Sequence, residues 1–269
     1  MKKYMIRCDI EGVSGVVSYD QADPEGAEFE MGRRLFMGDL TALLQGLNDG
    51  GADEIIIYDE HFRGRNIDLD ALPENATAIC GKPPYTAEWA GGLDSSCTGL
   101  ILLGFHSMRG TGAVLHHSYE PDIKELTLNG YPVGEIGIET AIAGDWGVPL
   151  QLISADSAGV REARELVPGV TGVTVKQSLG PSAAACPAGA VTRRALREAA
   201  EAVATPPPAT EPWQLKDPQL RVVFNPGPYL EAFRRLFDVD DSVVISGRTV
   251  TQCWADYWHM KLQAQEAVR

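Results

Sequence analysis

The sequence predicts an α/β protein with a mostly parallel sheet and flanking helices, followed by a smaller α+β C-terminal lobe. Short apolar runs alternate with helical patterns through the first half of the chain, and this alternation is typical of a parallel sheet. Several runs are apolar at every position, as strands buried on both faces are. A proline-rich stretch at residues 205–212 is typical of a stiff linker. We therefore expect an α/β metal-binding catalytic domain over residues 1–204 and the lobe over residues 205–269.

Hydrophobic periodicity defines the individual elements. Leucines recur at helical spacing between residues 28 and 47, and an Asn-Asp-Gly-Gly stretch then ends the predicted helix. Residues 125–133 form a predicted hairpin around Asn129 and Gly130. The other predicted strands are residues 4–7, 54–58, 76–80, 98–105, 150–155, 170–177, 220–225 and 242–246. The other predicted helices are residues 138–146, 160–166, 190–204, 229–236 and 250–267.

Composition and charge exclude several classes of function. The 269 residues are 44% hydrophobic and 22% charged, as in an ordinary globular protein with a sizeable core. The formal net charge of −14 disfavours nucleic acid as a partner, because such a surface repels phosphates. The sequence contains neither an apolar run of about 18 residues nor a signal-peptide core, so we expect no membrane association. Five scattered cysteines without CxxC spacing fit a reduced, cytoplasmic protein.

Four polar side chains follow predicted strands at their carboxyl ends. Asp9 and Glu11 come after the first strand, and their i, i+2 spacing places both on one face of an extended chain. His61 and His106 follow two later strands. Open α/β sheets bind ligands outside the carboxyl ends of their strands, so the fold would bring these groups together. Imidazole and carboxylate suit zinc, and also manganese or iron. Taken alone, each of these residues fits a solvated or structural role better than a metal site, so the metal site depends on their convergence.

Three further residues are candidates with open roles. Glu135 lies between glycines, where it fits a metal ligand, a solvated acid or a charge at a helix N-terminus. His117, in a loop, fits proton transfer or oxyanion stabilisation, and it equally fits a histidine bonded to backbone. We interpret His259, in the last predicted helix, as structural.

The chain resembles the zinc-dependent D-aminopeptidases of the DppA type. Most of the chain carries the resemblance, which is weaker after the proline-rich stretch. The motifs that carry it run in order: Asp9-Ile10-Glu11-Gly12-Val13-Ser14-Gly15, Asp59-Glu60-His61, Gly104-Phe105-His106, His117-Ser118, Pro132-Val133-Gly134-Glu135-Ile136-Gly137 and Val175-Lys176-Gln177. Each motif is unspecific by itself, whereas their order and spacing are specific.

This resemblance implies a function and a set of site residues. It implies two Zn²⁺ ions per chain with Asp9 shared between them, and it implies His117 as the catalytic histidine. The implied metal ligands are Asp9, Glu11, His61, His106 and Glu135. The implied reaction is hydrolysis of short peptides with a free N-terminus, D-amino-acid peptides included, by a water that the two metals activate. The implied assembly is a homo-oligomer, such as a decameric ring.

Two other functions remain open at this point. A phosphatase of the haloacid dehalogenase type also begins with a strand that ends in acids, D-x-D-G. Here Glu11 replaces the second aspartate and Val13 the usual threonine, and that mechanism has no use for the three histidines. A non-catalytic metal- or peptide-binding protein on the same scaffold is the second alternative. The sequence contains no HExxH helix and no GxSxG elbow, which disfavours single-zinc proteases and serine hydrolases.

Overall fold

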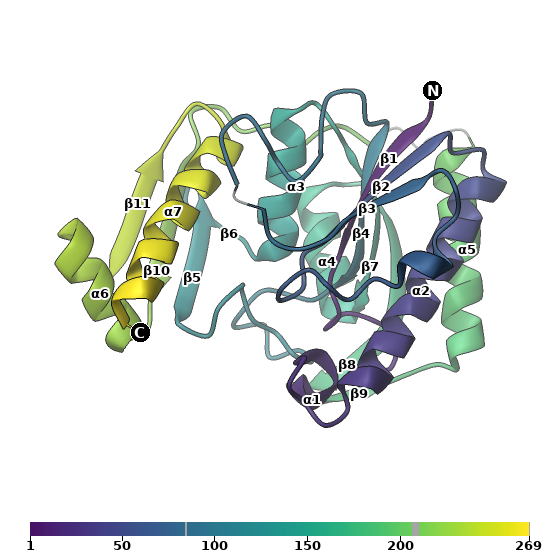
Figure 1. Ribbon diagram of the computed structural model, residues 1–269, viewed down its shortest axis with the longest axis horizontal. Coiled ribbons are helices and arrows are strands. Elements are labelled where there is room, and N and C mark those ends of the chain that lie inside the picture. Colours follow the sequence, from purple (N-terminus) through teal and green to yellow (C-terminus); the bar gives the residue numbers. More distant parts are fainter. Residues whose placement is uncertain (84, 206–209, 269) are drawn as a thin grey trace.

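The computed structural model describes residues 1–83, 85–205 and 210–268 of the chain. Figure 1 shows a large sheet with helices on both faces, and beside it a smaller lobe made of strands and two helices. The α/β fold with a mostly parallel sheet and a smaller α+β lobe is therefore confirmed. Residues 206–209, at the centre of the predicted linker, lie outside the described residues.

The main sheet has seven strands in the order β3-β2-β1-β4-β7-β8-β9. The first six run parallel, and only the short β9 is antiparallel to its neighbour. The strands are β1 (Lys3–Cys8), β2 (Glu54–Asp59), β3 (Ala76–Ile79), β4 (Gly99–Phe105), β7 (Leu150–Asp156), β8 (Thr171–Gly180) and β9 (Ala183–Ala185). The interior strand β1 pairs with both β2 and β4, so the ends of these three strands lie side by side.

Helices cover both faces of this sheet, as Figure 1 shows. On one face lie α2 (Phe29–Asp49) and α5 (Gly189–Ala204), which pack against each other. On the other face lie α3 (Glu135–Asp145) and α4 (Ser157–Leu166). The short α1 (Tyr19–Ala22) and the 3₁₀ turn η1 (Leu69–Ala71) lie in loops.

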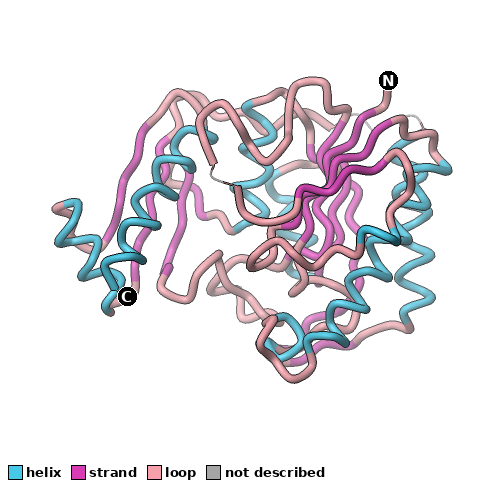
Figure 2. The backbone as a smooth tube through the Cα atoms, in the orientation of Figure 1, coloured by secondary structure: helices cyan, strands magenta, loops and turns pink. Residues whose placement is uncertain are grey.

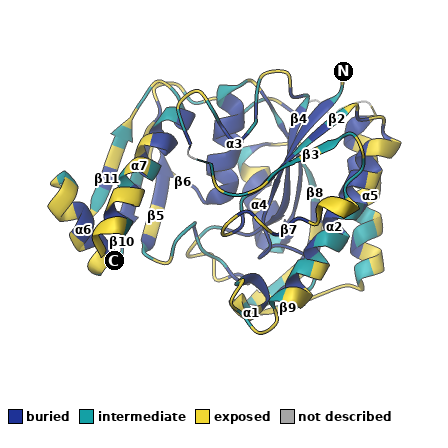
Figure 3. Ribbon diagram, in the orientation of Figure 1, coloured by how far each residue is buried: buried dark blue, intermediate teal, exposed yellow. Residues whose placement is uncertain are grey.

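Two hydrophobic cores, one on each face, explain the strands that are apolar at every position. In β1, Tyr4 and Ile6 contribute to the core under α2 and α5, whereas Met5 contributes to the core under α3 and α4. Figure 3 shows the central strands buried along their length. Burying one such aliphatic side chain contributes about 1.5–3 kcal/mol to folding, so the sheet is a rigid base for the loops that follow its strands.

The second sheet combines segments that lie far apart in the sequence. Its order is β11-β10-β5-β6, and all its pairings are antiparallel. Its elements are β5 (Ile123–Leu128), β6 (Tyr131–Pro132), β10 (Gln219–Phe224) and β11 (Ser242–Ser246), with helices α6 (Pro228–Phe237) and α7 (Val250–Val268). The predicted hairpin β5–β6 turns at Asn129 and Gly130, which both have positive φ, as a two-residue hairpin turn of this kind requires. The domain boundary after residue 204 stays a prediction.

The predicted elements are found, with shifts at their ends (Figure 2). The shift that affects the site is in α3, which begins at Glu135 and not at residue 138. Sequence patterns missed α1, η1 and β9, which are too short to show a period. No helix in the described part of the chain is both long and apolar enough to cross a membrane.

Candidate metal centre

A close backbone contact joins the loop after β1 to the end of β4. The amide of Gly12 donates to the carbonyl of Gly104 at 2.7 Å. A Cβ at Gly12 would lie 1.7 Å from the carbonyl oxygen of Phe105, and one at Gly104 would lie 2.2 Å from that of Asp9. Only glycine permits this approach. The contact therefore places Asp9 and Glu11 beside the residue that follows β4, His106.

Asp9, Glu11 and His61 form the first ligand group. The His61 Nδ1 atom lies 2.9 Å from Asp9 Oδ1 and 3.1 Å from Glu11 Oε2. All three side chains are buried. One ligand atom from each of the three lies within 4.8 Å of the others, a spacing that suits one metal ion.

Backbone contacts fix the orientation of His61. Its Nε2 atom lies 2.6 Å from the carbonyl oxygen of Ala22 in α1. A carbonyl oxygen can only accept a hydrogen bond, so Nε2 carries a proton and Nδ1 faces the carboxylates. Asp59 holds the same loop, because its carboxylate accepts from the amides of His61 and Asn66 at 3.2 and 2.7 Å. Such outer contacts are typical of histidines that bind metals.

His106, His117 and Glu135 form the second ligand group, and they too have ligand atoms within 4.8 Å of one another. Glu135 Oε1 lies 3.2 Å from His106 Nε2 and 3.8 Å from His117 Nε2. The two imidazoles stack with ring centroids 4.0 Å apart. The His117 side chain is 20% exposed, whereas His106 and Glu135 are more than nine-tenths buried. The site is therefore most open to solvent beside His117.

The Asp9 carboxylate connects the two groups. Its Oδ1 atom faces His61, and its Oδ2 atom lies 3.3 Å from His106 Nε2. Glu11 Oε2 and His106 Nε2 are buried, and no other described residue offers either atom a hydrogen bond of good geometry. Buried polar atoms without a hydrogen-bond partner are rare unless they bind an ion or a water molecule. The donor set thus fits two cations with one shared carboxylate.

The charges in the site support the same fit. Burial raises the pKa of Asp9, but the nearby imidazoles of His106 and His61 outweigh burial and hold that pKa well below its usual range. Burial lowers the pKa of both imidazoles, but the carboxylates around them raise it well above 6.5. Without metal, both imidazoles therefore carry protons that a cation would replace.

The neighbouring histidines 116 and 117 have different surroundings. His117 Nδ1 lies 2.9 Å from the Leu115 carbonyl, so Nδ1 carries a proton and Nε2 faces Glu135. His116 Nδ1 accepts from the amide of Gly110 at 3.0 Å, so His116 stabilises the backbone of the preceding loop. His259 is exposed on α7. All six predicted site residues are thus brought together, while the division of His117 between ligand and catalyst stays a prediction.

Sequence reasoning gave no role to two residues that support the site from outside. The buried Lys176 donates to the carbonyls of Glu11, Val13 and Val16 and so holds the turn after β1. Glu162 accepts from the amide of Met108 at 2.8 Å, and burial raises its pKa to about 7. The signal for Lys176 was a lysine within a buried strand and within the Val175-Lys176-Gln177 motif. Glu162 gave no such signal, although it lies on the buried face of α4.

The chain is similar to known D-aminopeptidases in both sequence and fold. A profile of the D-aminopeptidase family matches residues 1–260. A D-aminopeptidase of Bacillus subtilis (strain 168) is 32% identical over 200 residues, which cover 74% of this chain and 72% of that protein. In fold, the chain matches a solved structure described as the Zn-dependent D-aminopeptidase DppA from Bacillus subtilis, a self-compartmentalizing protease. The TM-score is 0.91 at 24% identity, and the match covers 98% of each chain.

Proposed function

This chain belongs to the D-aminopeptidase family, and we propose that it removes the N-terminal residue from short peptides by means of two zinc ions. Family membership disfavours the haloacid dehalogenase alternative, as does the use of three histidines in one site. The metal identity rests on the Bacillus structure, which is described as Zn-dependent, and on the mixed imidazole and carboxylate donors.

The observation that carries the proposal is the position of Asp9. Each of its two carboxylate oxygens faces a different histidine, at 2.9 Å from His61 and 3.3 Å from His106. A carboxylate between two half-sets of ligands is the arrangement that a dinuclear site needs. Glu11 completes one half and Glu135 the other, with His117 beside the second.

The residues divide the work of hydrolysis among them. Two zinc ions held here would lower the pKa of the attacking water and polarise the scissile carbonyl. Asp9, Glu11, His61, His106 and Glu135 would hold the ions. The Nε2 atom of His117, on the exposed side of the site, would first accept a proton from the attacking water. It would then donate that proton to the leaving amine, or a hydrogen bond to the developing oxyanion. The Leu115 carbonyl keeps that ring in the required orientation.

We also propose that the substrate carries a free α-amino group and that D-residues are accepted, as the family description implies. The Bacillus structure is described as self-compartmentalizing. On that ground we propose a homo-oligomer for this chain too, and a decameric ring as its specific form. A cytoplasmic location stays a prediction, consistent with five free cysteines.

Matched peptides test the function. D-alanyl and L-alanyl dipeptides are incubated with zinc-loaded protein, each with a free and with an acetylated N-terminus. We expect turnover of free peptides, faster for the D-form, and no turnover of acetylated ones. Equal turnover of free and acetylated peptides would refute the proposal that the chain is an exopeptidase. Binding of free peptides without any turnover would instead favour a non-catalytic peptide-binding protein.

A further inference from the structure

The loop that carries His117, residues 115–120, has an unusual backbone. Leu115 and Tyr119, on either side of the histidine, have φ values of 52° and 56°. Bulky residues rarely adopt this left-handed region, and such strain persists only where the surroundings fix it firmly. The contacts of Tyr119 are therefore of particular interest.

Tyr119 is held at three points. Its amide donates to Glu135 Oε1 at 2.6 Å, the same oxygen that lies near both histidines of the second ligand group. Its hydroxyl donates to Glu139 Oε1 at 2.9 Å, one helical turn further along α3. Its ring packs against Trp254 of α7, with centroids 4.5 Å apart. One residue thus connects a proposed ligand, the body of α3 and the second lobe.

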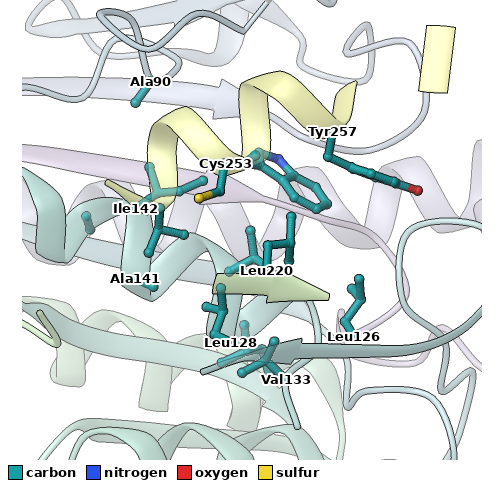
Figure 4. Packing of buried hydrophobic residues seen from close by; sticks show 14 of the residues in the cluster. Ala90, Leu126, Leu128, Val133, Ala141, Ile142, Leu220, Cys253 and Tyr257 are labelled. Atoms are coloured by element: carbon teal, nitrogen blue, oxygen red, sulfur yellow. The ribbon is translucent and has the colours of Figure 1, made fainter. Parts of the chain in front are cut away.

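Helix α7 reaches the loop at a second point. The buried Lys261 pairs with Glu120, the residue after Tyr119, and lies over the ring of Trp258 at 3.6 Å. Figure 4 shows Cys253 of α7 packed near Ile142 of α3 in a shared hydrophobic cluster. Because α7 packs on both α3 and the loop, it fixes the position of one relative to the other.

Glu139, which accepts the hydrogen bond of the Tyr119 hydroxyl, is itself held by the main sheet. Glu139 also pairs with the fully buried guanidinium of Arg7, which lies in the interior strand β1 and binds Glu60 at 2.7 Å. Burial raises the pKa of Glu139 to about 7 although Arg7 opposes this shift. The hydroxyl of Tyr119 is therefore bonded to a carboxylate that the main sheet itself holds in place.

We propose that Tyr119 is a positioning residue through which α7 holds Glu135 and the His117 loop in place. The second lobe is then part of the active site, although none of its helices supplies a proposed ligand. This inference rests on the proposed two-zinc function. It predicts that the Tyr119 hydroxyl matters for zinc at the second ligand group and not for zinc at the first.

Tyr119→Phe tests this role, because it removes the hydroxyl and keeps the ring. Zinc affinity is measured by competition with a chelator in two backgrounds: Glu11→Gln, which weakens the first group, and Glu135→Gln, which weakens the second. We expect Tyr119→Phe to lower zinc affinity about 10–100-fold in the Glu11→Gln background, the range for outer contacts of metal ligands. In the Glu135→Gln background we expect no change. The matched control is Tyr257→Phe, because Tyr257 is a buried tyrosine of α7 whose hydroxyl makes no hydrogen bond of good geometry to any described residue.

Two results would overturn the role of Tyr119: unchanged affinity in both backgrounds, or an equal loss in both. Trp254→Phe serves as a second variant, since it reduces the surface behind Tyr119 without touching a proposed ligand. It should show the same selectivity to a smaller extent. If the unmutated chain binds fewer than two zinc ions, the proposed function fails. If it binds two and Tyr119→Phe is unselective, only this inference fails.

Discussion

The three residues of the first ligand group all follow strands of the main sheet, whereas the second group also depends on a helix N-terminus and on a loop that the other lobe holds. Asp9, Glu11 and His61 follow two paired parallel strands and are buried. His106 follows a third strand, but Glu135 begins α3 and His117 lies in a loop, partly exposed. The buried group is thus suited to hold a metal firmly, and the more open one to meet the substrate.

The largest effect is expected from removing Asp9, the residue that both ligand groups share. Asp9→Ala should abolish binding of both ions and lower kcat/KM by about 10³–10⁴-fold or more, since metal stabilisation of the transition state contributes several kcal/mol. Metal analysis and peptide hydrolysis measure the two effects. A variant that keeps one tightly bound ion would show that Asp9 serves a single group.

His117→Ala separates catalysis from metal binding within the second group. If His117 transfers a proton or stabilises the oxyanion, kcat should fall by roughly 10²–10⁴-fold while zinc content stays unchanged. His116→Ala is the matched control and should cost far less, because His116 bonds to the Gly110 amide. Loss of zinc from His117→Ala would make this histidine a ligand, which its distance of 3.8 Å from Glu135 permits.

The same contrast explains which parts could be predicted from the sequence. The first group was predictable because buried parallel strands show as apolar runs, and their ends must meet at one edge of the sheet. His106 was predictable for the same reason. Glu135 and His117 received their roles only from the family resemblance, because hydrophobic periodicity does not predict the position of a loop in the folded chain.

Contacts between distant segments were beyond prediction from a single sequence. The pairing of β5 with β10 joins residues about one hundred positions apart, and alternation alone does not reveal a partner strand. Tyr119 gave no signal, because its role arises only when α7 packs against the loop. The early start of α3 was missed because Glu135, at the helix N-terminus, lies outside the apolar periodicity of that helix.

A smaller effect concerns pH. As pH rises, the stability contributed by the two histidines should fall in metal-free protein, whereas the stability contributed by bound zinc should increase. The pKa values of His61 and His106 are raised in the folded chain. Their stabilising contribution in metal-free protein is thus complete below about pH 6.5 and is lost as pH rises through the raised values. Zinc must displace these protons, so its affinity should rise by up to about tenfold per pH unit for each ion.

Thermal unfolding between pH 6 and pH 9, with and without zinc, checks this expectation. The Tm gained on adding zinc should grow with pH, and the contribution of the two histidines to the metal-free Tm should decline. A zinc-induced gain in Tm that does not depend on pH would mean that neither imidazole gives up a proton to the metal.

The claim that each ligand group binds one zinc ion is tested most directly by the zinc content of three proteins. These are the unmutated chain, Glu11→Gln and Glu135→Gln. Elemental analysis after zinc loading and dialysis against a weak chelator should give two ions per unmutated chain and close to one in each variant. Peptide hydrolysis should fall in both variants. One ion or none in the unmutated chain, even after zinc loading, would contradict the dinuclear site.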